Sequence, residues 1–298
     1  MGVVDAGRFH RLGLAVRDVD AAEGWLRRTF GAARTKGTGA PHQRAEAGTH
    51  AADEPDMRGA STRLLWHGGY PAILLGAADE DSVIGRFLQR WGPGLHSVAW
   101  EIGDMWAAEH RLRDRGIRIA AVNVAGRHFF MHPQDTHGLL MEWTDTFFVD
   151  DHRPTERLDP ARVTVAPAEG GGEVEGAALA WVTAVVRDAA STAAFLGDLA
   201  GARPVAGNAQ RDARVETTVD VAVGDVTIRL VTPRTPASAY HAVLEAGPRL
   251  WSYALRVPHL DAALEALERH GVRVCGREGG LAWTDPASTM GIPMELTG

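Results

Sequence analysis

The segment Phe9–Asp18, which reads FHRLGLAVRD, sets a pattern that returns three more times along this chain of 298 residues. In each copy an apolar, strand-like run is followed by an amphipathic helical run that ends at a glycine. The copies begin near residues 9, 95, 179 and 250. The distance from Asp18 to Gly31 is 13 positions, and the distance from Asp188 to Gly201 is the same. Such constant spacing is typical of an internal structural repeat.

The rest of each copy predicts strands. Residues 62–66 and 72–75 flank a turn at Gly68-Gly69, and residues 219–223 and 226–231 flank the two-residue hairpin signal Gly224-Asp225. Each copy is therefore a βαβββ unit, and two units must pair to bury one helix-covered sheet face. We expect an α+β fold of four βαβββ units paired into two barrel-like domains, residues 1–149 and 178–298. The Pro- and Gly-rich stretch 150–177 is the predicted linker.

The composition limits the kinds of site and the classes of partner that the chain can have. The chain has one cysteine, Cys275, and one lysine, Lys36, which excludes disulfides, cysteine zinc sites and, in practice, a Schiff-base lysine. Cys275 lies in a strand-like run and is expected in the core. The net charge of −7 and the scattered arginines argue against nucleic acid, and no apolar run approaches a membrane span. No signal peptide is recognisable, so we expect a cytoplasmic protein with a small-molecule substrate, and a homodimer stays open.

Two histidines and one glutamate stand out in the repeat register. His10 and His96 occupy the same position of the first and second units. Glu142 lies in the apolar strand-like run 139–143, where a carboxylate is costly to bury unless it is paired, hydrogen-bonded or metal-bound. Two histidines and one carboxylate suit a divalent Fe, Mn, Co, Ni or Zn ion, although a single buried histidine is more often an ordinary core residue.

These residues resemble the vicinal oxygen chelate superfamily, which includes glyoxalase I, methylmalonyl-CoA epimerase, extradiol dioxygenases and bleomycin-resistance proteins. The runs 81–98 and 132–142, the second reading HPQDTHGLLME, are similar to the epimerase segments that carry a metal histidine and a metal glutamate. The resemblance implies one divalent metal ion held by four side chains. His10, His96 and Glu142 match three of them, and the fourth position is Ile73, which has no ligand atom.

Three explanations for Ile73 stay open: a three-ligand site, a substitute such as His67 or a residue of the loop 34–60, or no metal at all. In the second half the equivalent positions are Ala180, Arg229, Trp251 and Glu295. Those four residues cannot hold an ion, so the second domain is predicted to be a degenerate copy without a metal site.

The predicted chemistry follows from the resemblance. The epimerase-type base falls near Asp56, and Glu142 is a second candidate for moving a proton. The expected substrate-binding residues are His67, Trp100, Phe130 and His137. The leading hypothesis is a metal-dependent enzyme that chelates two neighbouring oxygens and transfers a proton through an enolate, as an epimerase, isomerase or lyase. The alternatives are an extradiol-type Fe(II) dioxygenase and a metal-free binding protein of the resistance type.

Overall fold

The computed structural model describes residues 2–39, 61–122, 128–153, 171–206 and 212–298. Its first half contains β1 (Phe9–Ala15), α1 (Val19–Phe30), β2 (Ala33–Arg34), β3 (Thr38–Gly39), β4 (Thr62–His67), β5 (Tyr70–Leu75), α2 (Val83–Trp91), β6 (Gly94–Glu101), α3 (Met105–Asp114), β7 (Ile119–Val122), β8 (His128–Met131), the 3-10 turn η3 (Pro133–Asp135), β9 (Met141–Thr144) and β10 (Phe147–Phe148).

The second half repeats this order. It contains β11 (Ala178–Val185), α4 (Ala189–Ala200), β12 (Arg203–Pro204), β13 (Glu216–Val223), β14 (Val226–Pro233), α5 (His241–Ala246), β15 (Arg249–Arg256), α6 (Leu260–Arg269), β16 (Val274–Glu278), β17 (Leu281–Thr284), η4 (Pro286–Ser288) and β18 (Met294–Thr297). The four predicted βαβββ units are thereby confirmed.

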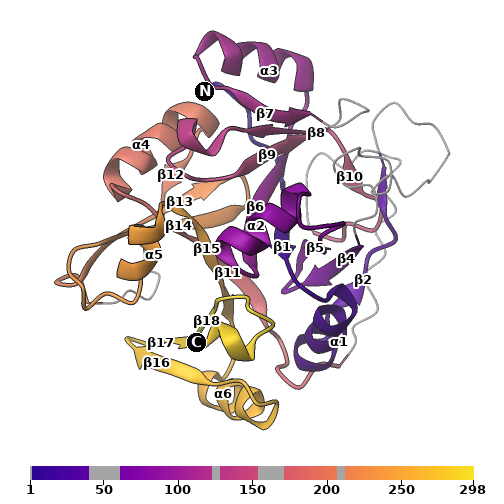
Figure 1. Ribbon diagram of the computed structural model, residues 1–298, viewed down its shortest axis with the longest axis vertical. Coiled ribbons are helices and arrows are strands. Elements are labelled where there is room, and N and C mark those ends of the chain that lie inside the picture. Colours follow the sequence, from indigo (N-terminus) through magenta and orange to yellow (C-terminus); the bar gives the residue numbers. More distant parts are fainter. Residues whose placement is uncertain (1, 40–60, 123–127, 154–170, 207–211) are drawn as a thin grey trace.

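Each half forms one eight-stranded sheet. The orders are β2-β4-β5-β1-β6-β9-β8-β7 and β12-β13-β14-β11-β15-β18-β17-β16, so the two sheets have the same topology. In each sheet the first strands of the two units pair antiparallel in the middle, β1 with β6 and β11 with β15. The fold is α+β, with two domains of the type expected from the repeat (Figure 1).

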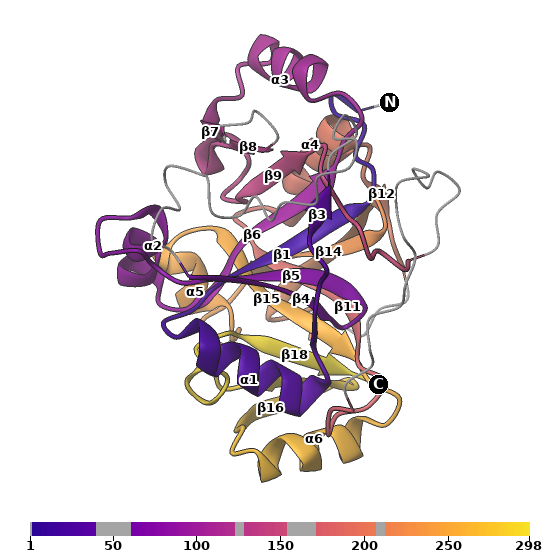
Figure 2. The same ribbon diagram turned by 90° about the vertical axis from the view of Figure 1, so that its right-hand side faces the viewer.

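Local signals in the sequence place the helices. Asp18, Asp104 and Asp188 accept a hydrogen bond from a backbone N–H of the first turn and cap their helices. Gly31 and Gly201 end α1 and α4 in the left-handed region, with φ of 68° and 66°. In both views α3 and α4 lie at one end of the molecule and α1 and α6 at the other, so each end carries a helix from each half (Figures 1 and 2).

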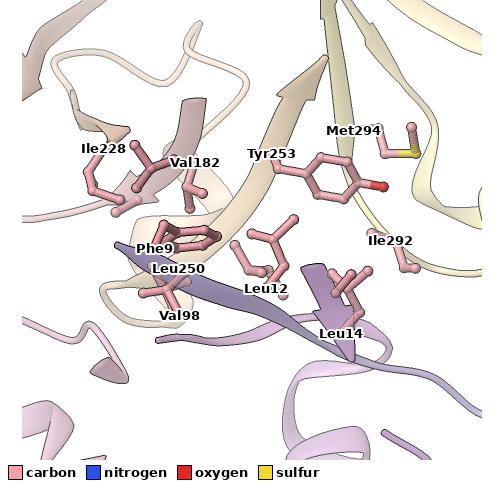
Figure 3. Close-up of a cluster of buried hydrophobic side chains, with 14 of the residues drawn as sticks. Phe9, Leu12, Leu14, Val98, Val182, Ile228, Leu250, Tyr253, Ile292 and Met294 are labelled. Carbon is pink, nitrogen blue, oxygen red and sulfur yellow. The ribbon is translucent and has the colours of Figure 1, made fainter. Parts of the chain in front are cut away.

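The two sheets share one apolar core. Leu12, Leu14 and Val98 of the first sheet point toward Leu250 and Tyr253 of the second (Figure 3). These side chains are at most 3% exposed. We call this side of each sheet its core face and the opposite side its inner face. Because one apolar cluster spans both halves, neither sheet has a complete core of its own.

Two details differ from the sequence-based expectations. Cys275 is exposed on β16, an edge strand, so its assignment to the core was wrong. The described ends of the predicted linker are partly built into the fold: Asp151 and Arg153 are buried, and Arg153 donates to the carbonyl of Phe9 and to Asp225 of the β13–β14 hairpin. No helix of the described residues is long and apolar enough to span a bilayer.

The shared core predicts that the two halves unfold together. Leu12→Ala removes a fully buried side chain between the sheets and should lower the free energy of unfolding by about 2–5 kcal/mol. Val83→Ala, at an exposed position, should change it by less than about 0.5 kcal/mol. Urea unfolding followed by tryptophan fluorescence and by circular dichroism should give one coincident transition. Two separate transitions would contradict a common core.

Candidate functional site

The inner face of the first sheet is set by the register of its central strands. Gly13 lies between Ile73 of β5 and Ser97 of β6. Arg11 lies beside Ala99, and Ala99 in turn lies beside Glu142 of β9. The alternate residues, such as Leu12 and Val98, belong to the core face, which leaves these positions on the inner one. The approximate symmetry of the two units relates one row of neighbours, Ile73–Gly13–Ser97, to the other, Glu142–Ala99–Arg11.

The four inner positions that correspond between the units are therefore Arg11, Ile73, Ser97 and Glu142. This register differs by one residue from the repeat alignment that selected His10 and His96. Arg11 and Ser97 alternate with the core-face residues Leu12 and Val98. The β1–β6 ladder also has two bulges, one between Phe9 and Arg11 and one on β6 opposite Gly13/Leu14. His10 and His96 occupy these bulges, about three residues or roughly 10 Å apart along the strands.

Arg11 forms a buried ion pair with Glu142. The side chain of Glu142 is 2% exposed and that of Arg11 is 12% exposed. A second partner of the same carboxylate oxygen is Nδ1 of His128, at 2.8 Å. Burial raises the pKa of Glu142, but the charge of Arg11 and the hydrogen bond from His128 outweigh it, so the pKa lies below its ordinary value. Glu142 is therefore a carboxylate at neutral pH.

These contacts close into a cycle of five side chains, which we call the Arg11 cycle. Arg11 donates to Nδ1 of His10 at 2.7 Å, and Nε2 of His10 lies 3.3 Å from the hydroxyl of Thr146. Thr146 lies 3.5 Å from Nε2 of His128, which returns to Glu142 through Nδ1. With Arg11 donating to its Nδ1, neutral His10 carries its proton on Nε2.

The Arg11 cycle does not suit a divalent ion. An ion needs neutral or anionic donor atoms, but Arg11 is a permanent cation that only donates, and Ile73 has no donor atom. The remaining inner positions are Ser97 and Glu142, and Glu142 is already held by Arg11 and His128. Within the described ranges, no group of three or more His, Cys, Asp or Glu side chains is arranged to hold a metal.

The three predicted metal ligands are consequently not brought together around one point. His10 and Glu142 both belong to the Arg11 cycle. His96 lies on the side of α2, where the centre of its ring is 4.9 Å from that of Phe87. It makes no hydrogen bond to Glu142, whose charge acts on it only by raising its pKa. The three-ligand arrangement on which the dioxygenase alternative depended is not formed by these side chains. Asp56, the predicted base, lies outside the described residues.

The predicted substrate-binding residues have different positions. Phe130 is half-buried on the inner face and pairs with Glu142. Trp100 instead lies on the core face, fully buried, and its indole N–H donates to the carbonyl of Val223, because Trp100 alternates with the inner Ala99. His67 is buried between the halves, with Nε2 at 2.9 Å from the hydroxyl of Tyr253.

His137 lies between the two halves as well. Its Nδ1 is 2.9 Å from the hydroxyl of Thr192, and its ring stacks on Phe195 of α4 at 4.8 Å. The backbone of His137 has a φ of 56°, a left-handed conformation that is uncommon for a residue with a side chain. The contacts of His67 and His137 thus join the two domains.

Arg11, His128 and Thr146 were not among the predicted site residues. One signal for Arg11 was present: Leu12 and Leu14 are apolar, and strand alternation then puts Arg11 on the other face. No comparable signal marks His128 or Thr146, because their proximity to Glu142 arises from pairing and turn geometry.

The second sheet carries a related carboxylate in a different setting. Its corresponding inner positions are Trp181, Arg229, Ser252 and Glu295, again shifted by one residue from the expected Ala180 and Trp251. Glu295 is 2% exposed and accepts hydrogen bonds from the hydroxyls of Thr183, Tyr240 and Ser252. Arg229 is paired with Asp220 instead.

Comparisons with known proteins agree with this architecture. The family profile of the Glyoxalase/Bleomycin resistance protein/Dioxygenase superfamily matches residues 10–131 and 182–283. The chain belongs to this superfamily.

Some relatives match about half of the chain, and one solved structure matches nearly all of it. An ethylmalonyl-CoA/methylmalonyl-CoA epimerase of Cereibacter sphaeroides is 32% identical over 144 residues, which are 46% of this chain and 96% of that protein. A solved methylmalonyl-CoA epimerase from Mycobacterium tuberculosis is 28% identical and covers 48% of this chain and 89% of its own, with a TM-score of 0.36. A mutant 4-hydroxymandelate synthase from Streptomyces coelicolor covers 98% of this chain and 92% of its own, with a TM-score of 0.64 at 16% identity, and shows the fold alone.

The buried ion pair predicts a specific pattern of stability. Arg11→Leu leaves the carboxylate of Glu142 without its cation and should lower the free energy of unfolding by about 3–5 kcal/mol. Adding Glu142→Gln to Arg11→Leu should recover part of this loss, because the stranded charge is removed. Urea denaturation of the single and double variants measures both effects. An additive loss in the double variant would show that the two side chains do not interact.

Stability should also fall below neutral pH. Burial lowers the pKa of His67 and of His96 from 6.5 to about 4, with Glu142 opposing the shift at His96. Between pH 6.5 and 4 the unfolded chain therefore binds more protons than the folded one, so stability decreases as the pH falls through this window.

From pH 7 to pH 5 each histidine should account for about 2 kcal/mol of this loss. His96→Gln should reduce the pH dependence measured by urea unfolding by about that amount, whereas His110→Gln, at an exposed position, should leave it unchanged. Equal pH dependence in His96→Gln and wild type would contradict a neutral His96.

Proposed function

We propose that the protein is an enzyme that moves a proton on a small organic substrate, next to a carbonyl group, and that it does so with the Arg11 cycle in place of a metal ion. The observation that carries this proposal is the hydrogen bond between Glu142 and Nδ1 of His128 beside the guanidinium of Arg11. A carboxylate, an imidazole and a fixed cation are the groups that enolate chemistry requires.

The roles follow from the hydrogen bonds. Glu142 accepts the Nδ1 proton of His128 and so leaves Nε2 of that ring as the basic nitrogen. The hydroxyl of Thr146 lies 3.5 Å from Nε2, a long contact that a substrate can replace. Nε2 takes the proton from the carbon atom, and the electron pair moves onto the carbonyl oxygen. Return of the proton to the opposite face of the same carbon gives the epimer without a further reactant, and return to the original face regenerates the substrate.

Arg11 would face the negative charge that develops on that oxygen. Its guanidinium has five N–H groups, and its contacts to His10 and Glu142 leave others available. The side chains of Arg11 and His128 are 12% and 13% exposed, whereas Glu142 is almost completely buried. The cation and the base can therefore be reached from the inner face, while Glu142 stays behind them as the residue that orients His128. The epimerase relative, which aligns with this half of the chain, supports the same class of reaction.

A second function, binding without turnover, is favoured by one observation. All five side chains of the Arg11 cycle have hydrogen-bond partners within the cycle, so it can also serve as a rigid polar patch that recognises a ligand.

Proton exchange separates the two functions. Methylmalonyl-CoA and ethylmalonyl-CoA, the thioesters named for the relative, would be incubated with the protein in D2O and a metal chelator, and followed by mass spectrometry. We expect deuterium at the carbon between the carbonyl groups, and a loss of about 100-fold or more in the exchange rate for His128→Gln. His110→Gln is the matched control. Binding of a thioester without exchange would support the binding function, and exchange abolished by the chelator would contradict a metal-free mechanism.

A further inference from the structure

A cavity of about 690 Å³ lies between the two halves of the chain. On one side its wall is formed by the end of α2, the start of β6 and the loop around η3. On the other side it is formed by Arg187, between β11 and α4, and by residues 247–250 at the start of β15. Both ribbon views place α2 near α5, the helix that leads into β15 (Figures 1 and 2). No side chain of the Arg11 cycle lines this cavity.

The wall of the cavity is positively charged. Its polar and charged lining includes Arg90, Arg187, Arg249, His96, His132 and His137. Among the described residues, no aspartate or glutamate lines the cavity, although the whole chain carries a net charge of −7. Over the part of the chain that the structure describes, none of the three arginines is paired with a carboxylate, and Arg249 donates only to the backbone carbonyls of Val243 and Gly247.

Two of the arginines share one aromatic ring. The guanidinium carbons of Arg90 and Arg249 lie 4.5 Å and 4.3 Å from the ring centre of Trp91. Burial, together with the charge of Arg90, lowers the pKa of Arg249. Two like charges held near one indole repel each other, and an anion that reaches both relieves this repulsion.

His96 adds a buried imidazole to this wall. Its side chain is buried, with 8% of the residue exposed, and it lines the cavity. Its Nδ1 atom is buried and has no hydrogen-bond partner among the described residues. Because this nitrogen is closed off from the cavity as well as from solvent, it does not by itself locate a ligand.

We propose that this cavity is a binding site for an organic polyanion, a ligand that joins a diphosphate-like group to a planar ring. The diphosphate oxygens would contact Arg90, Arg187 and Arg249, since guanidinium groups bind phosphate through paired hydrogen bonds. The ring would lie against the apolar part of the wall, which includes Phe87 and Leu250. The volume exceeds that needed for a single inorganic ion and falls in the range of small-molecule pockets.

The test uses ADP as the probe, with adenosine and inorganic pyrophosphate as its two parts. Isothermal titration calorimetry on the full chain at low ionic strength should show ADP binding more tightly than either part. Arg90→Ala and Arg187→Ala should each weaken ADP binding by about tenfold. Both side chains are exposed, so the melting temperature without ligand should stay at the wild-type value.

Arg256→Ala is the matched control, since it removes one exposed arginine at the far end of β15 and should leave ADP binding unchanged. The proposal is overturned if wild type does not bind ADP, if adenosine binds as tightly as ADP, or if Arg90→Ala and Arg187→Ala bind it as wild type does. None of these results depends on proton transfer at the Arg11 cycle.

Discussion

The antiparallel pairing of β1 with β6, interrupted by a bulge on each strand, determines which side chains lie on the inner face of the first sheet. Between the bulges the ladder is regular, so Arg11 and Ser97 alternate with the core-face residues and face inward, whereas His10 and His96 fall at the bulges. The same register puts Arg11 beside Ala99 and thus within reach of Glu142 on β9. The polar cycle, the separation of His10 from His96 and the buried carboxylate all depend on this one ladder.

Each half of the chain buries one carboxylate in the last strand of its second unit, and the two carboxylates have different partners. A carboxylate in the last strand of a unit must be compensated once it is taken out of water. Glu142 is compensated by a full charge on Arg11 and by an imidazole. Glu295 is compensated by hydroxyl groups, because the position that corresponds to Arg11 is Trp181 and the nearby Arg229 is held by Asp220. The first site contains an imidazole that can accept a proton and a guanidinium that can face an oxyanion. In the second site, Glu295 is hydrogen-bonded to neighbouring hydroxyl groups instead.

Much of the fold could be predicted because it depends on local and periodic signals. The capping residues Asp18 and Gly31, the hairpin at Gly224 and the spacing of the units are all visible in the chain. The bulges were not visible, since one extra residue in a ladder depends on how two distant strands meet. Glu142 was found from its apolar surroundings. Arg11 was missed although its alternation with Leu12 and Leu14 was visible, and His128 was missed because its approach to Glu142 depends on the pairing of β8 with β9. Trp100 and Cys275 were misplaced for a related reason: an apolar strand does not show which of its faces is covered.

The apolar layer between the sheets has a consequence for how the inter-domain cavity is assembled. If the two halves were separate polypeptides, the meeting of α2 with the start of β15 would vary with protein concentration. Here one covalent chain holds both partners, so each half experiences the other at a constant, high effective concentration. Completion of the cavity wall is then an intramolecular property of every folded copy, independent of protein abundance.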